Sequence, residues 1–139
     1  MEMGTLREGR IIKTAHGHFA EDVWDGVNRS GIVPIGDKVL VRVDEALAKI
    51  GSIHLTNETH ERQRMASTTG VLVAMGASAF TWNGSRTLRW EGDRPGLGSR
   101  VLFTRYAGQE YTGDDGRFYR VLDDVAIGAM RQSSEGDGA

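Results

Sequence analysis

Hydrophobic and polar residues alternate in short segments separated by turn residues. The clearest segment is 38–43, Lys-Val-Leu-Val-Arg-Val, whose valines at every second position give the period of a half-buried β-strand. Shorter β-branched or aromatic runs follow at 70–76, 100–104, 110–112, 118–122 and 125–128. Almost no helical periodicity accompanies them. The pattern therefore predicts about seven short strands closed into a small all-β barrel.

The alternation stops between residues 45 and 68. This stretch is polar except for a small apolar island, Ile53-His54-Leu55. Loops longer than about 12 to 15 residues are uncommon in a compact domain unless they are functional or disordered. We therefore expect this loop to carry a function.

A second projection is predicted at about residues 76–96. Asn83-Gly84 lies between two runs that contain aromatic residues, which favours a two-residue type I′ hairpin turn. Phe80, Trp82 and Trp90 either stack on single-stranded bases or pair across the hairpin. Pairing is favoured because the neighbouring sequence is only weakly basic.

Both ends of the chain lack such patterning. Residues 1–31 form an N-terminal extension of unknown role, and residues 131–139 are small and polar, which predicts a disordered tail. The 139 residues suit one domain. Neither a secretory signal nor an apolar run long enough for a membrane span is present in the sequence.

Net charge and cysteine content disfavour or exclude several classes of function. The formal net charge of −2 argues against nucleic acid as the main partner, because phosphate binding draws on clustered Lys and Arg. The chain has no cysteine, which excludes disulfides and thiolate chemistry and favours the cytoplasm.

No catalytic or metal site is predicted. His16, His18, His54 and His60 are spread along the chain with no cysteine to complete a zinc site. The acidic pairs at 114–115 and 123–124 adjoin turns or strand ends, where aspartate is favoured for its backbone hydrogen bonds. The Gly96-x-Gly98 pair lacks the third glycine of a dinucleotide fingerprint.

Four segments taken in order resemble the GroES-type co-chaperonin family. They are the opening strand with its proline and aspartate-basic pair (32–42), the small-residue and aliphatic segment 49–56, the strand 69–76, and the C-terminal half built from 97–103, 106–108 and 119–127. The resemblance covers residues 32–130 and leaves both ends unmatched. The unmatched N-terminal extension suggests a divergent, phage-encoded member working in a host cytoplasm.

The resemblance implies a GroES-like β-barrel with a mobile loop at about 45–68 and a dome hairpin at about 76–96. It implies a homo-oligomeric ring, a heptamer, that caps a GroEL-type chaperonin and encloses a substrate protein. Ile53, His54 and Leu55 are the expected chaperonin-binding residues, with Gly51 and Ser52 as the loop hinge. The protein needs no cofactor of its own, since the partner binds and hydrolyses ATP.

In extended backbone Ile53 and Leu55 point to one side and His54 to the other, which makes His54 a spacer whose protonation tunes binding. The other interpretation is that both aliphatic residues pack on the barrel. Two further classes stay open from the sequence: a phage-associated nucleic-acid-binding or virion β-barrel protein, and the co-chaperonin-like domain of zinc dehydrogenases, which the missing cysteines disfavour.

Overall fold

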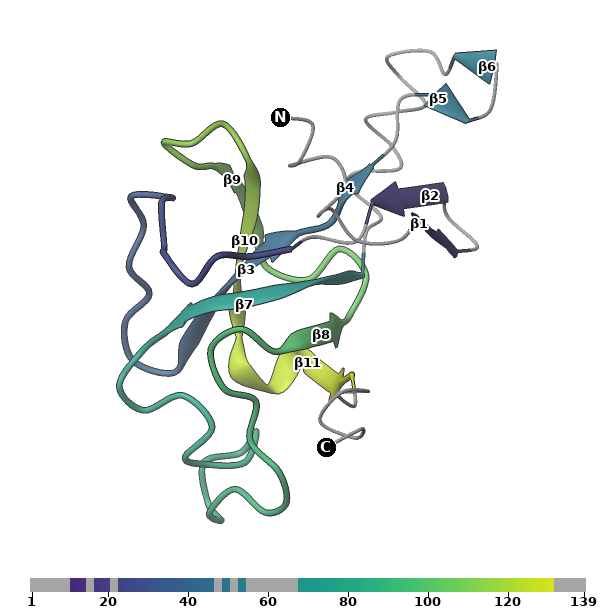
Figure 1. Ribbon diagram of the computed structural model, residues 1–139. Helices are drawn as coiled ribbons and strands as arrows, with labels where there is room; N and C mark the ends of the chain where they lie inside the picture. The colour runs from purple at the N-terminus through teal and green to yellow at the C-terminus, as the bar shows by residue number, and fades with distance from the viewer. Residues whose placement is uncertain are drawn as a thin grey trace.

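The computed structural model describes residues 11–14, 17–20, 23–46, 49–50, 53–54 and 68–131 (Figure 1). The chain forms eleven strands and one short 3₁₀ helix, η1, in these residues. Their bounds are β1 (Ile11–Thr14), β2 (Gly17–Ala20), β3 (Lys38–Val43), β4 (Glu45–Ala46), β5 (Lys49–Ile50), β6 (Ile53–His54), β7 (Thr69–Met75), β8 (Arg100–Phe103), β9 (Gln109–Thr112), β10 (Phe118–Asp123), η1 (Asp124–Ala126) and β11 (Ile127–Met130).

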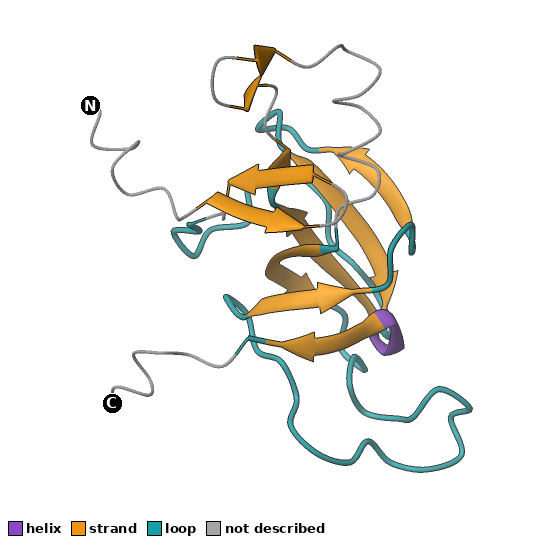
Figure 2. Ribbon diagram, turned by 90° about the vertical axis from the view of Figure 1, so that its right-hand side faces the viewer, coloured by secondary structure: helices purple, strands orange, loops and turns teal. Residues whose placement is uncertain are grey.

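Six of these strands form one antiparallel sheet in the order β11-β8-β7-β3-β10-β9. The sheet curls around its own core, and this confirms the all-β, barrel-type fold (Figure 2). Two smaller sheets accompany it, β1-β2-β4 and β5-β6. No helix in the described residues is long and apolar enough to cross a membrane.

The strands expected from alternation lie close to the observed ones. β3 has the bounds that were predicted, and the later strands differ by a residue or two at their ends. Strands β1, β2, β4, β5 and β6 lie where the sequence predicted an unpatterned extension or a loop. The opposite change is at 124–126, which was partly assigned to a strand. It is η1, a tight turn that leads the chain into β11.

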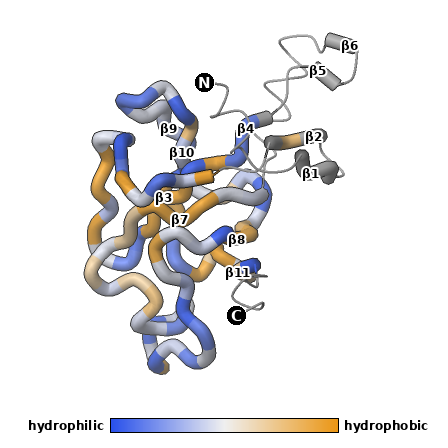
Figure 3. The backbone as a smooth tube through the Cα atoms, in the orientation of Figure 1, coloured by the Kyte–Doolittle hydropathy of each residue, from blue (hydrophilic) through white to orange (hydrophobic). Residues whose placement is uncertain are grey.

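The inner face of the sheet holds the larger cluster of buried side chains. Alternate residues of the central strands point into it, and η1 and the dome hairpin close one end. Figure 3 shows that hydrophobic residues concentrate along these strands. The buried members of this cluster are Val39, Val41, Val43, Leu72, Phe80, Val101, Phe103, Leu122 and Ile127.

The outer face of β3 and β7 is also apolar, and here the prediction of a half-buried strand is wrong. Leu40, Val71 and Val73 are at most 2% exposed. Trp24 and Ile32, which precede the barrel, pack against them. Part of the N-terminal extension therefore covers the second face of the sheet.

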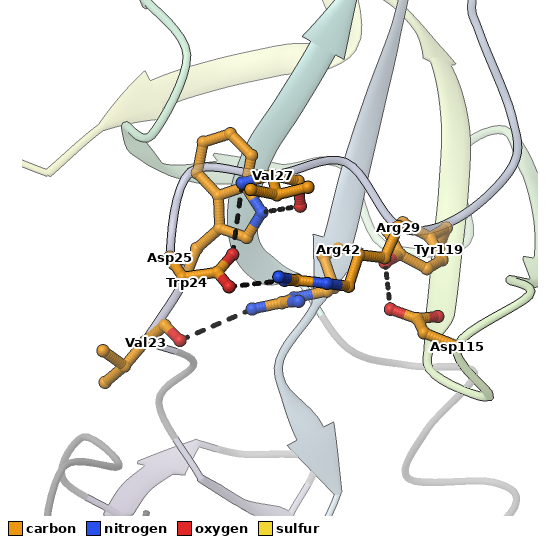
Figure 4. A network of polar contacts seen from close by, with 8 residues as sticks. All are labelled: Val23, Trp24, Asp25, Val27, Arg29, Arg42, Asp115 and Tyr119. Carbon is orange, nitrogen blue, oxygen red and sulfur yellow. Dashed lines mark hydrogen bonds and ion pairs between the residues drawn. The ribbon is translucent and has the colours of Figure 1, made fainter.

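A polar network holds this covering segment in place (Figure 4). The Trp24 indole donates to the carbonyl of Val27 at 2.8 Å, and Asp25 accepts from the backbone N–H of Val27 at 3.1 Å and pairs with Arg29. The Arg29 hydrogen bond is the main reason that the pKa of Asp25 lies below its usual range.

Beneath the segment, the Tyr119 hydroxyl donates to Asp115 at 2.6 Å (Figure 4). Burial, reinforced by the hydrogen bond to Asp115, raises the pKa of Tyr119 to about 12. Burial alone would raise the pKa of Asp115, but the hydrogen bonds from Tyr119 and from the Arg117 backbone outweigh it, so this pKa is lowered.

The dome hairpin projects as expected, but its turn differs from the prediction. The Arg86 N–H donates to the Asn83 carbonyl at 2.9 Å and the Asn83 N–H to the Leu88 carbonyl at 2.8 Å. The Asn83 side-chain oxygen also accepts from Thr87 and Leu88 backbone N–H groups at 3.2 and 3.4 Å. These bonds favour a wider loop, with Arg86 rather than Gly84 at positive φ, over a two-residue type I′ turn.

Gly76 ends β7 where no side chain fits. A Cβ there would lie 2.2 Å from the Gly36 carbonyl oxygen, which is backbone and cannot swing aside. We expect Gly76→Ala to lower the free energy of unfolding by about 1 to 3 kcal/mol, as overpacking does. Gly96→Ala, with nothing within 4 Å of the new Cβ, is the control. Equal urea midpoints for the two variants would contradict this account.

The Tyr119 hydroxyl should shape the alkaline limit of stability. Its folded pKa lies above the unfolded value of about 10, so its contribution is complete below that pH. It is lost as the pH rises towards about 12. Urea unfolding should therefore show a smaller alkaline decline for Tyr119→Phe than for the unmodified protein, with Tyr111→Phe at an exposed position as control. Identical declines would show that the hydroxyl contributes nothing.

Candidate functional site

The described strands within the long loop and the dome hairpin lie at opposite ends of the barrel. β4, β5 and β6 lie at one end, and the hairpin between β7 and β8 lies at the other (Figures 1 and 2). Because the sequence singled out the loop at 45–68, the candidate site is its root and the short strands within it.

A buried ion pair fastens the two ends of this loop. Asp44 directly follows β3 and Thr69 begins β7, so they are the residues on either side of the loop. The Asp44 N–H donates to the Thr69 carbonyl at 3.1 Å, and the Thr69 hydroxyl donates to the Asp44 carboxylate at 2.5 Å. Arg100 in β8 donates to both carboxylate oxygens at 3.1 and 2.5 Å. We call Asp44, Thr69 and Arg100 the loop clamp.

Because the loop clamp is buried, removing one of its charged members is costly. The Asp44 side chain is fully buried and that of Arg100 is 19% exposed. Removing one partner of such a pair leaves a desolvated charge without its counter-charge. The clamp holds together the start of the loop, the end of the loop and the neighbouring strand.

Sequence reasoning missed the loop clamp. Asp44 stands where an alternating strand gives way to a loop, a position at which aspartate is ordinary. No spacing rule joins it to a residue 56 positions away, so only the sheet order β3-β7-β8 reveals the pair.

Inside the loop, β5 and β6 pair antiparallel. Ile50 stands opposite Ile53, and Lys49 opposite His54. The structure thus places the backbone of two proposed chaperonin-binding residues, Ile53 and His54, in a strand. Leu55 and the proposed hinge residues Gly51 and Ser52 lie outside the described residues. Their roles remain predictions.

The aromatic residues of the dome hairpin serve the hairpin itself. Phe80 is buried and meets Trp90 edge to face, with ring centroids 5.1 Å apart. The Arg89 guanidinium lies over the Trp82 ring at 4.9 Å, and the two residues form a β-bridge. This confirms the expectation of pairing across the hairpin.

The two acidic pairs have separate structural tasks. Asp115 accepts from the Arg117 backbone N–H at 3.0 Å, which is the turn chemistry that was expected. Asp124 is 4% exposed and accepts from the Phe80 N–H at 2.8 Å, which ties η1 to the dome hairpin.

A cavity of about 220 Å³ lies beside that junction. Ion pairs bridge its wall, from Lys38 to Asp123 and from Arg86 to Asp37. Among the described residues, no three His, Cys, Asp or Glu side chains gather as metal ligands would. His16 and His60 lie outside those residues.

Comparisons with known proteins bear on this barrel. The family model described as "Chaperonin 10 Kd subunit" matches residues 31–130. The co-chaperonin GroES of Bacillus sp. (strain PS3) is 34% identical over 97 residues, which cover 70% of this chain and 95% of that protein. That of Leuconostoc citreum (strain KM20) is 34% identical over 100 residues, covering 68% and 95%.

The 20 kDa chloroplastic chaperonin of Arabidopsis thaliana is 33% identical over 104 residues, 73% of this chain. The chain spans 35% of the length of that protein but nearly all of the two bacterial ones. Fold and matches together define a small β-barrel protein of the co-chaperonin class. The chain belongs to the chaperonin 10 kDa subunit family, as the resemblance to GroES-type proteins indicated.

We expect Asp44→Ala to cost about 3 kcal/mol of unfolding free energy, because it removes the buried carboxylate to which Arg100 donates two hydrogen bonds. Asp123→Ala breaks the exposed pair with Lys38 and should cost less than about 1 kcal/mol. Urea unfolding of both variants measures the difference. If Asp44→Ala lowers the free energy of unfolding no more than Asp123→Ala does, the loop clamp adds little to stability.

Proposed function

We propose that this co-chaperonin caps a GroEL-type chaperonin ring in an ATP-dependent cycle and closes the chamber in which a substrate protein folds. The observation that carries the proposal is the family match, which spans the barrel together with the long loop between β3 and β7. ATP is bound and hydrolysed by the partner, and this chain supplies binding surfaces rather than catalytic groups.

The proposed chaperonin-binding segment is Ile53, His54 and Leu55, in which Ile53 and Leu55 are the apolar contacts and His54 is the spacer between them. Residues directly opposite one another in an antiparallel pair occupy the same face of the ladder. Position 50 pairs with position 53 in this register, which supports including Ile50 as a third aliphatic residue of the proposed contact. Burial of Ile53 and Leu55 in a groove of the partner would supply about 1.5 to 3 kcal/mol each.

A ring is the second part of the proposal. β9 and β11 are the edge strands of the six-stranded sheet and expose main-chain groups to another chain. Val33 and Ile35, just before β3, are each 77% exposed, which suits an interface. We propose that copies of this chain associate through such edges into a homo-oligomer, a heptamer, in the cytoplasm.

Assembly matters because a single loop binds weakly. Ordering a flexible segment costs about 1 to 2 kcal/mol per residue for the backbone, which offsets most of the gain from two aliphatic side chains. Several loops on one ring raise the effective concentration of those not yet bound, by which avidity exceeds single-site affinity by about 10² to 10⁴. Such binding is tight overall while each contact stays reversible.

The double variant Ile53→Ser with Leu55→Ser tests the proposed apolar contacts with the chaperonin. We expect it to form the same oligomer as the unmodified protein but to lose association with a GroEL-type chaperonin in the presence of ATP. Gel filtration of the mixture measures association, and native mass spectrometry measures the number of subunits.

His54→Ser is the matched control, since it changes the same segment while leaving both aliphatic residues. It should retain most of the binding. Full association of the double variant would overturn the loop assignment, and a monomeric unmodified protein would overturn the ring.

A further inference from the structure

The N-terminal extension, which precedes the family match, occupies two defined places on the barrel. Residues 23–30 lie over the outer face, next to Ile32 of the matched region, and β2 pairs with β4 at the start of the long loop. We propose that this extension is a brace that holds the first strand of the chaperonin-binding loop. The proposal rests on the function proposed above and assigns a role to residues that the family match leaves out.

The covering segment is fixed at both of its ends. At one end Trp24 packs on the outer apolar cluster, and at the other the Ser30 carbonyl accepts from the Asp114 N–H at 2.9 Å. Gly31, at φ +79°, approaches Asp114 so closely that a Cβ would lie 2.1 Å from its carboxylate. The segment therefore lies against the 113–116 turn and cannot slide along the sheet.

This anchorage keeps β2 near the loop. Ala20 and Val23 are separated by three peptide links, which span at most about 11 Å of extended chain. A strand tethered so closely has a high effective concentration for its neighbour. The Arg42 guanidinium, in β3, reaches the Val23 carbonyl at 3.5 Å and so joins this tether to the strand that leads into β4 (Figure 4).

The pairing itself has a defined register. Phe19 stands opposite Ala46 and Ala20 opposite Glu45, while β1 pairs with the other edge of β2. Phe19 is 1% exposed, so the hairpin is packed against the protein rather than held by main-chain bonds alone. Glu45 directly follows Asp44 of the loop clamp. The main-chain pairing of β2 with β4 and the side-chain contacts of the loop clamp therefore lie next to each other at the start of the loop.

The brace lowers the cost of binding. Residues 45 and 46 are already ordered when the loop meets its partner, so their backbone entropy is not lost again. If the backbone of one residue is already fixed before binding, the affinity of a single loop is higher by about tenfold. Loss of the pairing should therefore weaken binding by about tenfold or more for each loop.

Phe19→Asp, made in the full-length protein, places a charge at a buried position of the brace. We expect faster hydrogen exchange at the amides of Glu45 and Ala46 and an at least tenfold higher concentration for half-saturation of a GroEL-type chaperonin. Leu97→Asp makes the same kind of change at an exposed position outside the brace and should alter neither. Unchanged binding by Phe19→Asp despite faster exchange would overturn the brace.

A disulfide provides a test that does not depend on how Phe19→Asp folds. The chain has no cysteine, so within one chain Ala20→Cys with Glu45→Cys can form only the bond across this register. Mild oxidation should link it readily. Ala20→Cys with Ala46→Cys, shifted by one residue and so facing opposite sides, should link poorly.

The linked protein should bind the chaperonin at least as tightly as the same protein after reduction. Failure to link, or weaker binding when linked, would overturn the brace. Should the unmodified protein bind no chaperonin, the proposed function fails, whereas exchange and cross-linking still report whether the extension holds β4.

Discussion

Strands β3 and β7 carry apolar side chains on both faces, and the organisation of the molecule follows from the need to cover each face. The inner face is covered when the sheet curls on itself and packs Val41 and Leu72 among the other core residues. Among the described residues, no second sheet packs on the outer face. Residues 23–32 cover it, with Trp24 and Ile32 over Leu40. Apolar burial is worth about 25 cal/mol per Å², so an uncovered outer face would lose a large share of the stability of so small a domain. The extension is thus part of the fold, and its path over the sheet brings β2 beside the root of the loop.

The root of the loop joins the barrel to the proposed chaperonin-binding segment. A grip that contributes to several simultaneous contacts needs a fixed origin, because positional freedom at the base lowers the effective concentration of every loop that has yet to bind. The loop clamp supplies the fixed origin through Asp44 and Arg100, which hold strands β3, β7 and β8 in one arrangement. The dome hairpin at the other end is secured differently, by Asp124 and by the Phe80–Trp90 ring pair. Each projection is therefore fastened where it leaves the barrel.

The strands and the barrel were predictable from sequence because alternation and turn residues are local signals, and β3 was assigned to the residue. The family was recognisable because its segments occur in order. Two of the features that sequence reasoning missed are non-local. Nothing in the sequence around Leu40 says that Trp24 will cover it, and nothing near Asp44 names Arg100. The turn at Asn83 was misjudged because a side-chain oxygen that accepts from two backbone N–H groups competes with the local preference of an Asn-Gly pair.

The proposed brace and the proposed multiplicity of loops would act on the same quantity, the entropy that is lost when the loops bind the chaperonin. Multiplicity lowers the loss for the later loops but leaves the first one unchanged, since effective concentration applies only after one contact exists. Ordering of β4 by β2 lowers the loss for every loop, including the first. The two devices therefore differ in kinetics. Fixing the root favours the initial encounter, while the number of loops governs how long the lid remains. If the proposed brace and the proposed contact at Ile53 hold, a co-chaperonin of this design can bind through a weaker apolar contact and still close the chamber, and a weaker contact releases faster once the partner changes state.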